Sequence, residues 1–146
     1  MKRTILIAFL LAMPLMGEAF EDKLYKQHGV YKIFYSAFNS SFIEPDIAVI
    51  NNIVRGKGKG MVNIAVIQEL AIGGTPSTIT GQVFNILQQS QTLDFVAVRE
   101  EQSVYYLAPF EFEDQDYLTF KITVKPNHGE PSYAYDFKFQ KKMYHD

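Results

Sequence analysis

The 146-residue chain has 14 Lys and Arg against 16 Asp and Glu, a net charge of −2, and no Cys. A mildly acidic chain without a basic block lacks the electrostatic footprint of a nucleic-acid-binding protein, and without Cys it has neither disulfides nor a thiol for lipid attachment. The 12 Phe and 9 Tyr, with no Trp, are expected to fill an apolar core. One domain is the natural count, since domains span roughly 100–200 residues.

Residues 1–19 have the pattern of a secretory signal peptide: two basic residues, an apolar run and small residues before a cleavage site after Ala19. The apolar run is shorter than the about 20 residues of a membrane-spanning helix and contains Pro14. A retained N-terminal anchor is the alternative. We expect cleavage, one domain over residues 20–146, a periplasmic location, and membrane contact only through the cleaved segment.

After a polar lead (residues 21–27), the sequence consists of short stretches rich in β-branched and aromatic residues, separated by turn residues. The predicted strands are 29–38, 61–68, 77–87, 92–100, 103–112, 117–125 and 132–140. In the last two, apolar and polar residues alternate, which is typical of an antiparallel sheet with one buried face. The loop between them, residues 126–131, begins and ends with proline and is expected to lie outside the sheet.

These elements predict an all-β fold, an immunoglobulin-like antiparallel β-sandwich of about seven strands. A short helix is predicted after the first strand, within residues 44–52, because Pro45 suits a first helical position and Asn51-Asn52 a helix end. The alternative is a closed eight-stranded barrel, which requires one more strand.

The triplet Asn39-Ser40-Ser41 interrupts an apolar run between Phe38 and Phe42. Asn and Ser hydrogen-bond to nearby backbone and favour turns, so the triplet predicts a corner at the end of the first strand. Both phenylalanines are then expected to anchor the corner in the core. The alternative is a polar pocket flanked by aromatic rings, suited to a small polar ligand or a peptide end.

Three further segments carry chemistry of their own. Residues 55–60 (RGKGKG) combine cations with glycines, which suits an anion, but the segment lacks the Gly-Lys-Ser/Thr ending of a nucleotide-binding loop and is predicted to be a solvated hairpin tip. The acidic run 111–116 lacks the calcium-loop pattern and is predicted to be a turn. Met143-x-His145 offers only a weak copper(I) motif. We therefore predict no metal and no cofactor.

No pattern for catalysis is present. The sequence contains no Cys nucleophile, no Gly-x-Ser-x-Gly elbow and no His-Glu-x-x-His helix. We predict that the protein is not an enzyme. A hydrolase assembled from scattered residues needs a Ser–His contact, for example between His28 or His128 and Ser40 or Ser41.

The order of motifs in residues 31–66 is distinctive: Ala37-Phe38-Asn39-Ser40-Ser41-Phe42, then Pro45, then Val54-Arg55, then Asn63-Ile64. It resembles a family of small exported proteobacterial proteins described as a domain of unknown function, with a core Ala-Phe-Asn-Ser-Ser/Thr-Phe motif. The resemblance covers the chain after the signal peptide and implies an immunoglobulin-like sandwich in the periplasm. Gly56 stands where the family usually has Ser. If the family shares a binding surface, the candidate residues are Asn39, Ser40, Ser41, Arg55 and Asn63.

Three function classes are compared on these grounds. The first is a non-enzymatic periplasmic binding or accessory module that contacts an envelope protein or peptide through a sheet edge or the Asn39 corner. The second is a small-molecule or metal carrier with a pocket between the sheets. The third is the scattered-residue hydrolase. The sequence favours the first.

Overall fold

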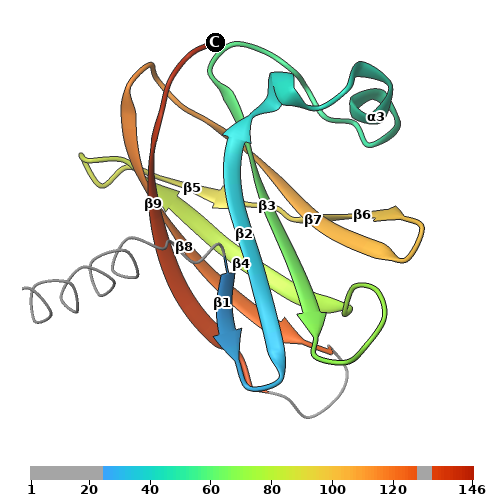
Figure 1. Cartoon of the computed structure of the whole chain (residues 1–146). Coiled ribbons are helices and arrows are strands. Elements are labelled where there is room, and N and C mark those ends of the chain that lie inside the picture. The colour runs from blue at the N-terminus through green and yellow to red at the C-terminus, as the bar shows by residue number, and fades with distance from the viewer. Residues whose placement is uncertain (1–24, 128–132) are drawn as a thin grey trace, which may run out of the picture.

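The computed structural model describes residues 25–127 and 133–146, which form two packed antiparallel sheets (Figure 1). The predicted signal peptide and His128 lie outside these residues. The first sheet has the order β1-β2-β3-β7-β6. Its strands are β1 (Tyr25–His28), β2 (Tyr31–Asn39), β3 (Lys59–Gln68), β7 (Ser103–Glu111) and β6 (Val96–Glu100).

The second sheet has the order β5-β4-β8-β9. Its strands are β5 (Ser90–Leu93), β4 (Ser77–Phe84), β8 (Asp116–Pro126) and β9 (Tyr135–Met143). The predicted all-β antiparallel sandwich is therefore confirmed, but the number of strands is wrong: the described residues form nine, not about seven.

The two additional strands have separate causes. Tyr25–His28, predicted as part of a polar lead, is strand β1, which pairs with β2 across the two-residue turn at Gly29 and Val30. Gly29 has a φ of +58°, which suits such a tight turn. The predicted strand 92–100 is two strands, because the chain leaves the second sheet after Leu93 and enters the first at Val96.

The hydrophobic core lies between the sheets, because alternate side chains along each strand point toward the opposite sheet. In β8, Leu118, Phe120, Ile122 and Val124 are buried, and the residues between them face the other way. Phe120 packs against Phe139 of its own sheet and against Phe110 of the first sheet. Aromatic side chains thus join the two layers without any disulfide, as their bulk allows.

Two short helical elements lie between β2 and β3: the 3-10 helix η1 (Ser40–Phe42) and the helix α3 (Pro45–Ile50). Pro45 occupies the beginning of α3, as predicted, and the Asn51 side chain donates to the Ile47 carbonyl oxygen at its end (2.9 Å). The helix follows the second strand rather than the first because β1 precedes β2. We call residues 40–58, which leave β2 and return to β3, the arm; in Figure 1 its helix projects from the sheet.

Among residues 25–127 and 133–146, no helix has the length and apolar character needed to cross a membrane.

Candidate functional site

Ser40 closes the base of the arm. It is fully buried, and its Oγ accepts a hydrogen bond from the backbone N–H of Gly56 (3.1 Å). The same Oγ lies 3.4 Å from the Gly56 carbonyl oxygen, to which it donates. Because this buried hydroxyl both donates to and accepts from the backbone of Gly56, Ser40 connects the two ends of the arm.

The other residues of the corner contact the last residues of the chain. The Asn39 side chain donates to the Tyr144 carbonyl oxygen (2.8 Å), and the Ser41 hydroxyl donates to the Asp146 carboxylate. Arg55 donates through Nη2 to the Ser41 carbonyl oxygen (2.9 Å). Four of the five candidate residues, Asn39, Ser40, Ser41 and Arg55, are therefore brought together, and the fifth is not.

The Ser41–Asp146 contact gives a prediction about pH. The Ser41 hydroxyl lowers the pKa of the Asp146 carboxyl below its ordinary value of 3.8, with a smaller contribution from the charge of His145. A hydrogen bond to the charged form has this sign. The hydrogen bond to the charged carboxylate is therefore present at neutral pH and is weakened as the pH falls through the lowered pKa. An NMR titration of the Asp146 side chain should show the lowered pKa, and Ser41→Ala should return it toward 3.8.

The matched control for this titration is Ser90→Ala, which removes an exposed hydroxyl on β5. It should leave the pKa of Asp146 where it is. Equal titration curves for Ser41→Ala and the unaltered protein would show that the hydroxyl does not hold this carboxylate.

Phe42 does not anchor the corner in the core, as the sequence had led us to expect: 73% of its surface is exposed. The reason is that η1 carries the chain out of the plane of β2 before Phe42 is reached. Phe38 lies on the outer face of the first sheet, since its neighbours Ala37 and Asn39 in β2 have the opposite orientation. Both rings therefore lie outside the core between the sheets: Phe42 belongs to the arm, and Phe38 lines a pocket together with residues of the arm.

The outer face of the first sheet is unusually apolar. An antiparallel sheet with one solvated face normally presents polar side chains there. Here the residues paired across β3, β7 and β6 on that face are Met61 with Pro109, Asn63 with Leu107, Leu107 with Val96, and Tyr105 with Val98. Met61 is 1% exposed and Ala48 of α3 is 3% exposed, yet neither belongs to the main core cluster. The arm and this face thus form a second, smaller apolar cluster.

Two pockets lie along this cluster. The first has a volume of about 330 Å³ and lies between the end of the arm and β6–β7, with Ile53, Val54, Met61 and Pro109 among its walls. The second, about 280 Å³, lies at the beginning of the arm and includes Asn63. Val98 and Leu107 line both. Around them the arm exposes four large apolar side chains: Phe42, Val49, Ile50 and Val54.

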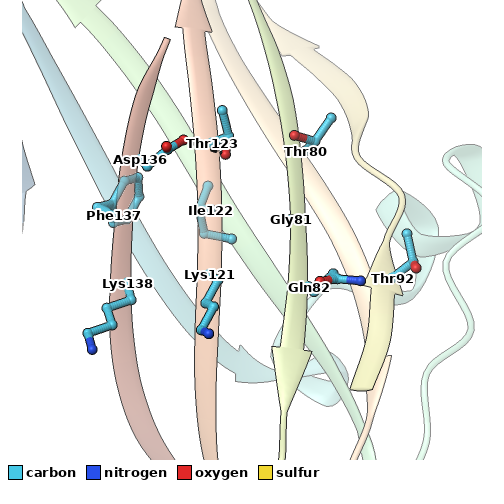
Figure 2. A pocket seen from close by; sticks show the side chains of 10 residues that line it. All are labelled: Thr80, Gly81, Gln82, Thr92, Lys121, Ile122, Thr123, Asp136, Phe137 and Lys138. Atoms are coloured by element: carbon cyan, nitrogen blue, oxygen red, sulfur yellow. Dashed lines mark hydrogen bonds between the residues drawn. The ribbon is translucent and has the colours of Figure 1, made fainter. Parts of the chain in front are cut away.

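The outer face of the second sheet has a different character. A wide, open hollow of about 680 Å³ lies over β9, β8, β4 and β5 (Figure 2). It presents mostly Thr, Gln, Lys and Asp side chains, the usual wet face of an antiparallel sheet. Thr123 donates to Asp136 (2.7 Å) and the Lys121 ammonium lies 4.8 Å from the Phe84 ring centroid, so these polar groups are paired with near neighbours.

The remaining predicted segments are accounted for as follows. In the 55–60 segment, the chain turns at Gly56–Lys59, and Lys59 forms an ion pair with Glu111 (3.2 Å). The acidic run forms the β7–β8 turn, with Asp116 accepting from the Glu113 N–H (3.1 Å). In the described part of the chain, no group of three or more His, Cys, Asp or Glu is placed to hold a metal.

Among the residues that the structure describes, neither His28 nor His145 hydrogen-bonds to Ser40 or Ser41. His28 Nε2 lies 3.2 Å from the Tyr133 carbonyl oxygen, and its ring stacks on Tyr135. His145 Nε2 lies 3.3 Å from the Phe112 carbonyl oxygen.

The fold is that of a two-sheet antiparallel sandwich with an apolar arm on one outer face. The chain belongs to the DUF4426 family, a domain of unknown function, whose model matches residues 25–146. The crystal structure of a DUF4426 family protein from Pseudomonas aeruginosa PAO1 is similar, with a TM-score of 0.75 and 30% sequence identity, over 87% of this chain and 98% of that one. The predicted family resemblance is thus confirmed.

The structure is more distantly similar to FetP of uropathogenic Escherichia coli strain F11. The as-isolated protein, recombinantly expressed in the periplasm of E. coli, gives a TM-score of 0.57 at 11% identity, over 83% of this chain and 93% of that one. A copper-bound variant of FetP gives 0.52 at 12% identity, over 83% and 89%. At these identities the likeness shows a shared fold. No curated protein matches the sequence.

The arm was not predicted from the sequence as an exposed apolar surface. The pattern that indicates it is Val49-Ile50, two adjacent apolar residues at the end of a helix of six residues. So short a helix cannot bury both, and they are 76% and 77% exposed.

Proposed function

We propose that the protein is a non-enzymatic periplasmic binding or accessory module that acts through protein or peptide contacts made by the arm and the outer face of the first sheet. The observation that carries the proposal is the apolar surface formed by Phe42, Val49, Ile50 and Val54 beside two pockets. Phe42 and Val54 line these pockets, and exposed apolar side chains beside a pocket are typical of a contact surface. Strand β6 adds support, because among the described strands it is an edge strand that pairs only with β7, and an extended segment can hydrogen-bond to such an edge.

The arm is a better contact surface than the corner of Asn39, Ser41 and Arg55. The corner groups already bond to Tyr144, Asp146 and each other. A partner would have to break these bonds before it could form its own, so the net gain would be small. Burial of the apolar side chains of the arm, by contrast, lowers the free energy of the complex, and no existing hydrogen bond has to be broken.

The second candidate is a metal or small-molecule carrier. It is favoured by the likeness of the fold to a protein whose structure includes a copper-bound variant. The pockets described above lie on the outer faces of the sheets, whereas the space between the sheets holds the core cluster of Phe120, Ile64 and their neighbours. Contact with a protein or peptide therefore remains the first candidate.

The experiment is cross-linking of the tagged protein in the intact periplasm, comparing the unaltered chain with the double variant Val49→Asp and Ile50→Asp. We expect a discrete cross-linked species whose yield falls several-fold in the variant, because carboxylates resist the burial that contact requires. The matched control is Ile86→Asp with Leu87→Asp, an equally exposed apolar pair in the β4–β5 loop.

Both double variants alter exposed side chains, so their thermal unfolding should match that of the unaltered protein. Cross-linked species that disappear equally in both variants, or in neither, would show that the arm is not the contact surface.

A further inference from the structure

The smaller pocket at the beginning of the arm differs from an ordinary apolar groove. Its walls come from β2, the arm, β3, β6 and β7 and include Phe38, Phe42, Asn63, Tyr105 and Leu107. Its volume of about 280 Å³ is at the lower limit of ligand pockets, which usually measure about 300–1,000 Å³. A pocket of this size suits one side chain of a partner better than a whole cofactor.

Asn63 gives the pocket an acceptor without a donor. It lies in β3 between Ser36 of β2 and Leu107 of β7, in the middle of the outer face. Its Oδ1 is buried and accepts no hydrogen bond from the described residues. Because nearly all buried polar atoms are hydrogen-bonded, this oxygen needs a donor from outside these residues, which either a water molecule or a bound group can supply.

The charges around the pocket define that donor. Glu44 and Glu100 line it, and no Lys or Arg does. In the described part of the chain neither carboxylate takes part in an ion pair; the ion pair there joins Lys59 to Glu111. The rings of Phe38, Phe42 and Tyr105 add faces of negative potential, which attract cations.

A cation with an apolar stem satisfies all of these features. Lysine and arginine place methylene groups along apolar walls and carry several N–H donors at the tip. The neighbouring pocket of about 330 Å³, lined by Met61, Val96 and Pro109, suits an apolar side chain next to the cation. Because Val98 and Leu107 line both pockets, one short segment can fill the two together.

We propose that this pocket binds a lysine or arginine side chain of a partner protein or peptide, with its cationic tip donating to Asn63 Oδ1 between Glu44 and Glu100, and with an apolar neighbour in the adjacent pocket. The inference rests on the proposed function and specifies the chemistry of the partner.

The probe is a pair of synthetic pentapeptides, acetyl-LTRTL-amide and acetyl-LTETL-amide, followed by NMR shifts of the isotope-labelled protein. We expect the arginine peptide to shift the amides of residues 61–65 and 105–107 and to bind at least about tenfold more tightly than the glutamate peptide, since hydrogen bonds to charged groups are strong. Its affinity should also fall with added salt, which screens exposed charges.

Two variants separate the contribution of the Asn63 oxygen to binding from that of the two carboxylates. Asn63→Leu removes the orphan oxygen and should weaken the arginine peptide several-fold while leaving the protein at least as stable, because an unpaired buried acceptor is removed. Glu44→Gln with Glu100→Gln should weaken the arginine peptide and bring its affinity close to that of the glutamate peptide. Glu113→Gln, in the β7–β8 turn, is the matched charge control and should change nothing.

Equal binding of the two peptides, or shifts confined to residues outside the arm and first sheet, would overturn this inference. If the cross-linked species is nevertheless lost in the Val49 and Ile50 variant, the proposed function stands and only the cationic partner is wrong. If cross-linking also fails, both are wrong.

Discussion

Replacing Phe120 with alanine is expected to lower the free energy of unfolding by about 3–5 kcal/mol, the usual cost of removing a large buried ring. Phe120 has no exposed surface. Its ring stacks on Phe139, with centroids 4.7 Å apart, and meets the edge of Phe110 at 5.1 Å. Phe110 belongs to the opposite sheet, so the substitution removes a contact that joins the two layers.

Chemical denaturation measures this cost. The matched control is Phe42→Ala, whose ring is 73% exposed, and it should change stability by no more than about 0.5 kcal/mol. If the two alanine variants are equally stable, Phe120 does not hold the sheets together.

Gly60→Ala is expected to destabilise the protein by about 1–3 kcal/mol, because an added carbon overfills a packed core. Gly60 pairs with Phe110 across β3 and β7. A Cβ at Gly60 would lie 2.4 Å from Cζ of the Phe110 ring, which is itself buried and has little room to move. The absence of a side chain therefore lets the ring lie across the strand.

The nearby Gly56→Ala variant tests whether this effect is specific. Its Cβ would meet the Lys59 side chain at 3.4 Å, an ordinary contact, and it should leave the midpoint of denaturation almost unchanged. Combining Gly60→Ala with Phe110→Leu should recover part of the loss, since the smaller side chain vacates the space. A double variant that loses the sum of both single effects would contradict the proposed overlap.

The fold could be predicted from the sequence wherever one face of a strand is buried and the other is exposed to solvent. Strand β8 satisfies this rule from Leu118 to Val124 and was placed to within a residue or two. Strand β1 does not, because Tyr-Lys-Gln-His has no apolar alternation and forms through pairing with β2. The split at Asp94–Phe95 was also not predicted, since residues 92–100 are rich in β-branched and apolar residues on both sides of it, although the two halves belong to different sheets.

Of the candidate residues, Asn39, Ser41 and Arg55 meet because the arm leaves β2 and returns beside it. From the sequence they were candidates only as polar positions, and their contacts were not predicted. Their contacts with Tyr144 and Asp146 span 105 residues and depend on how the two sheets are stacked. Asn63 lies apart, on the outer face, since it belongs to the middle of β3 and not to the corner.

The crossing at Asp94–Phe95 also joins the two sheets covalently along one side of the sandwich. It joins β5 and β6, the edge strands of the two sheets, so one side of the sandwich is closed by two residues of continuous backbone. On the opposite side, β9 meets β2 through side chains, among them Lys141 donating to the Ala37 carbonyl oxygen. We therefore expect local opening that admits water to the aromatic core to begin between β1 and β9, with the covalent crossing acting as the hinge.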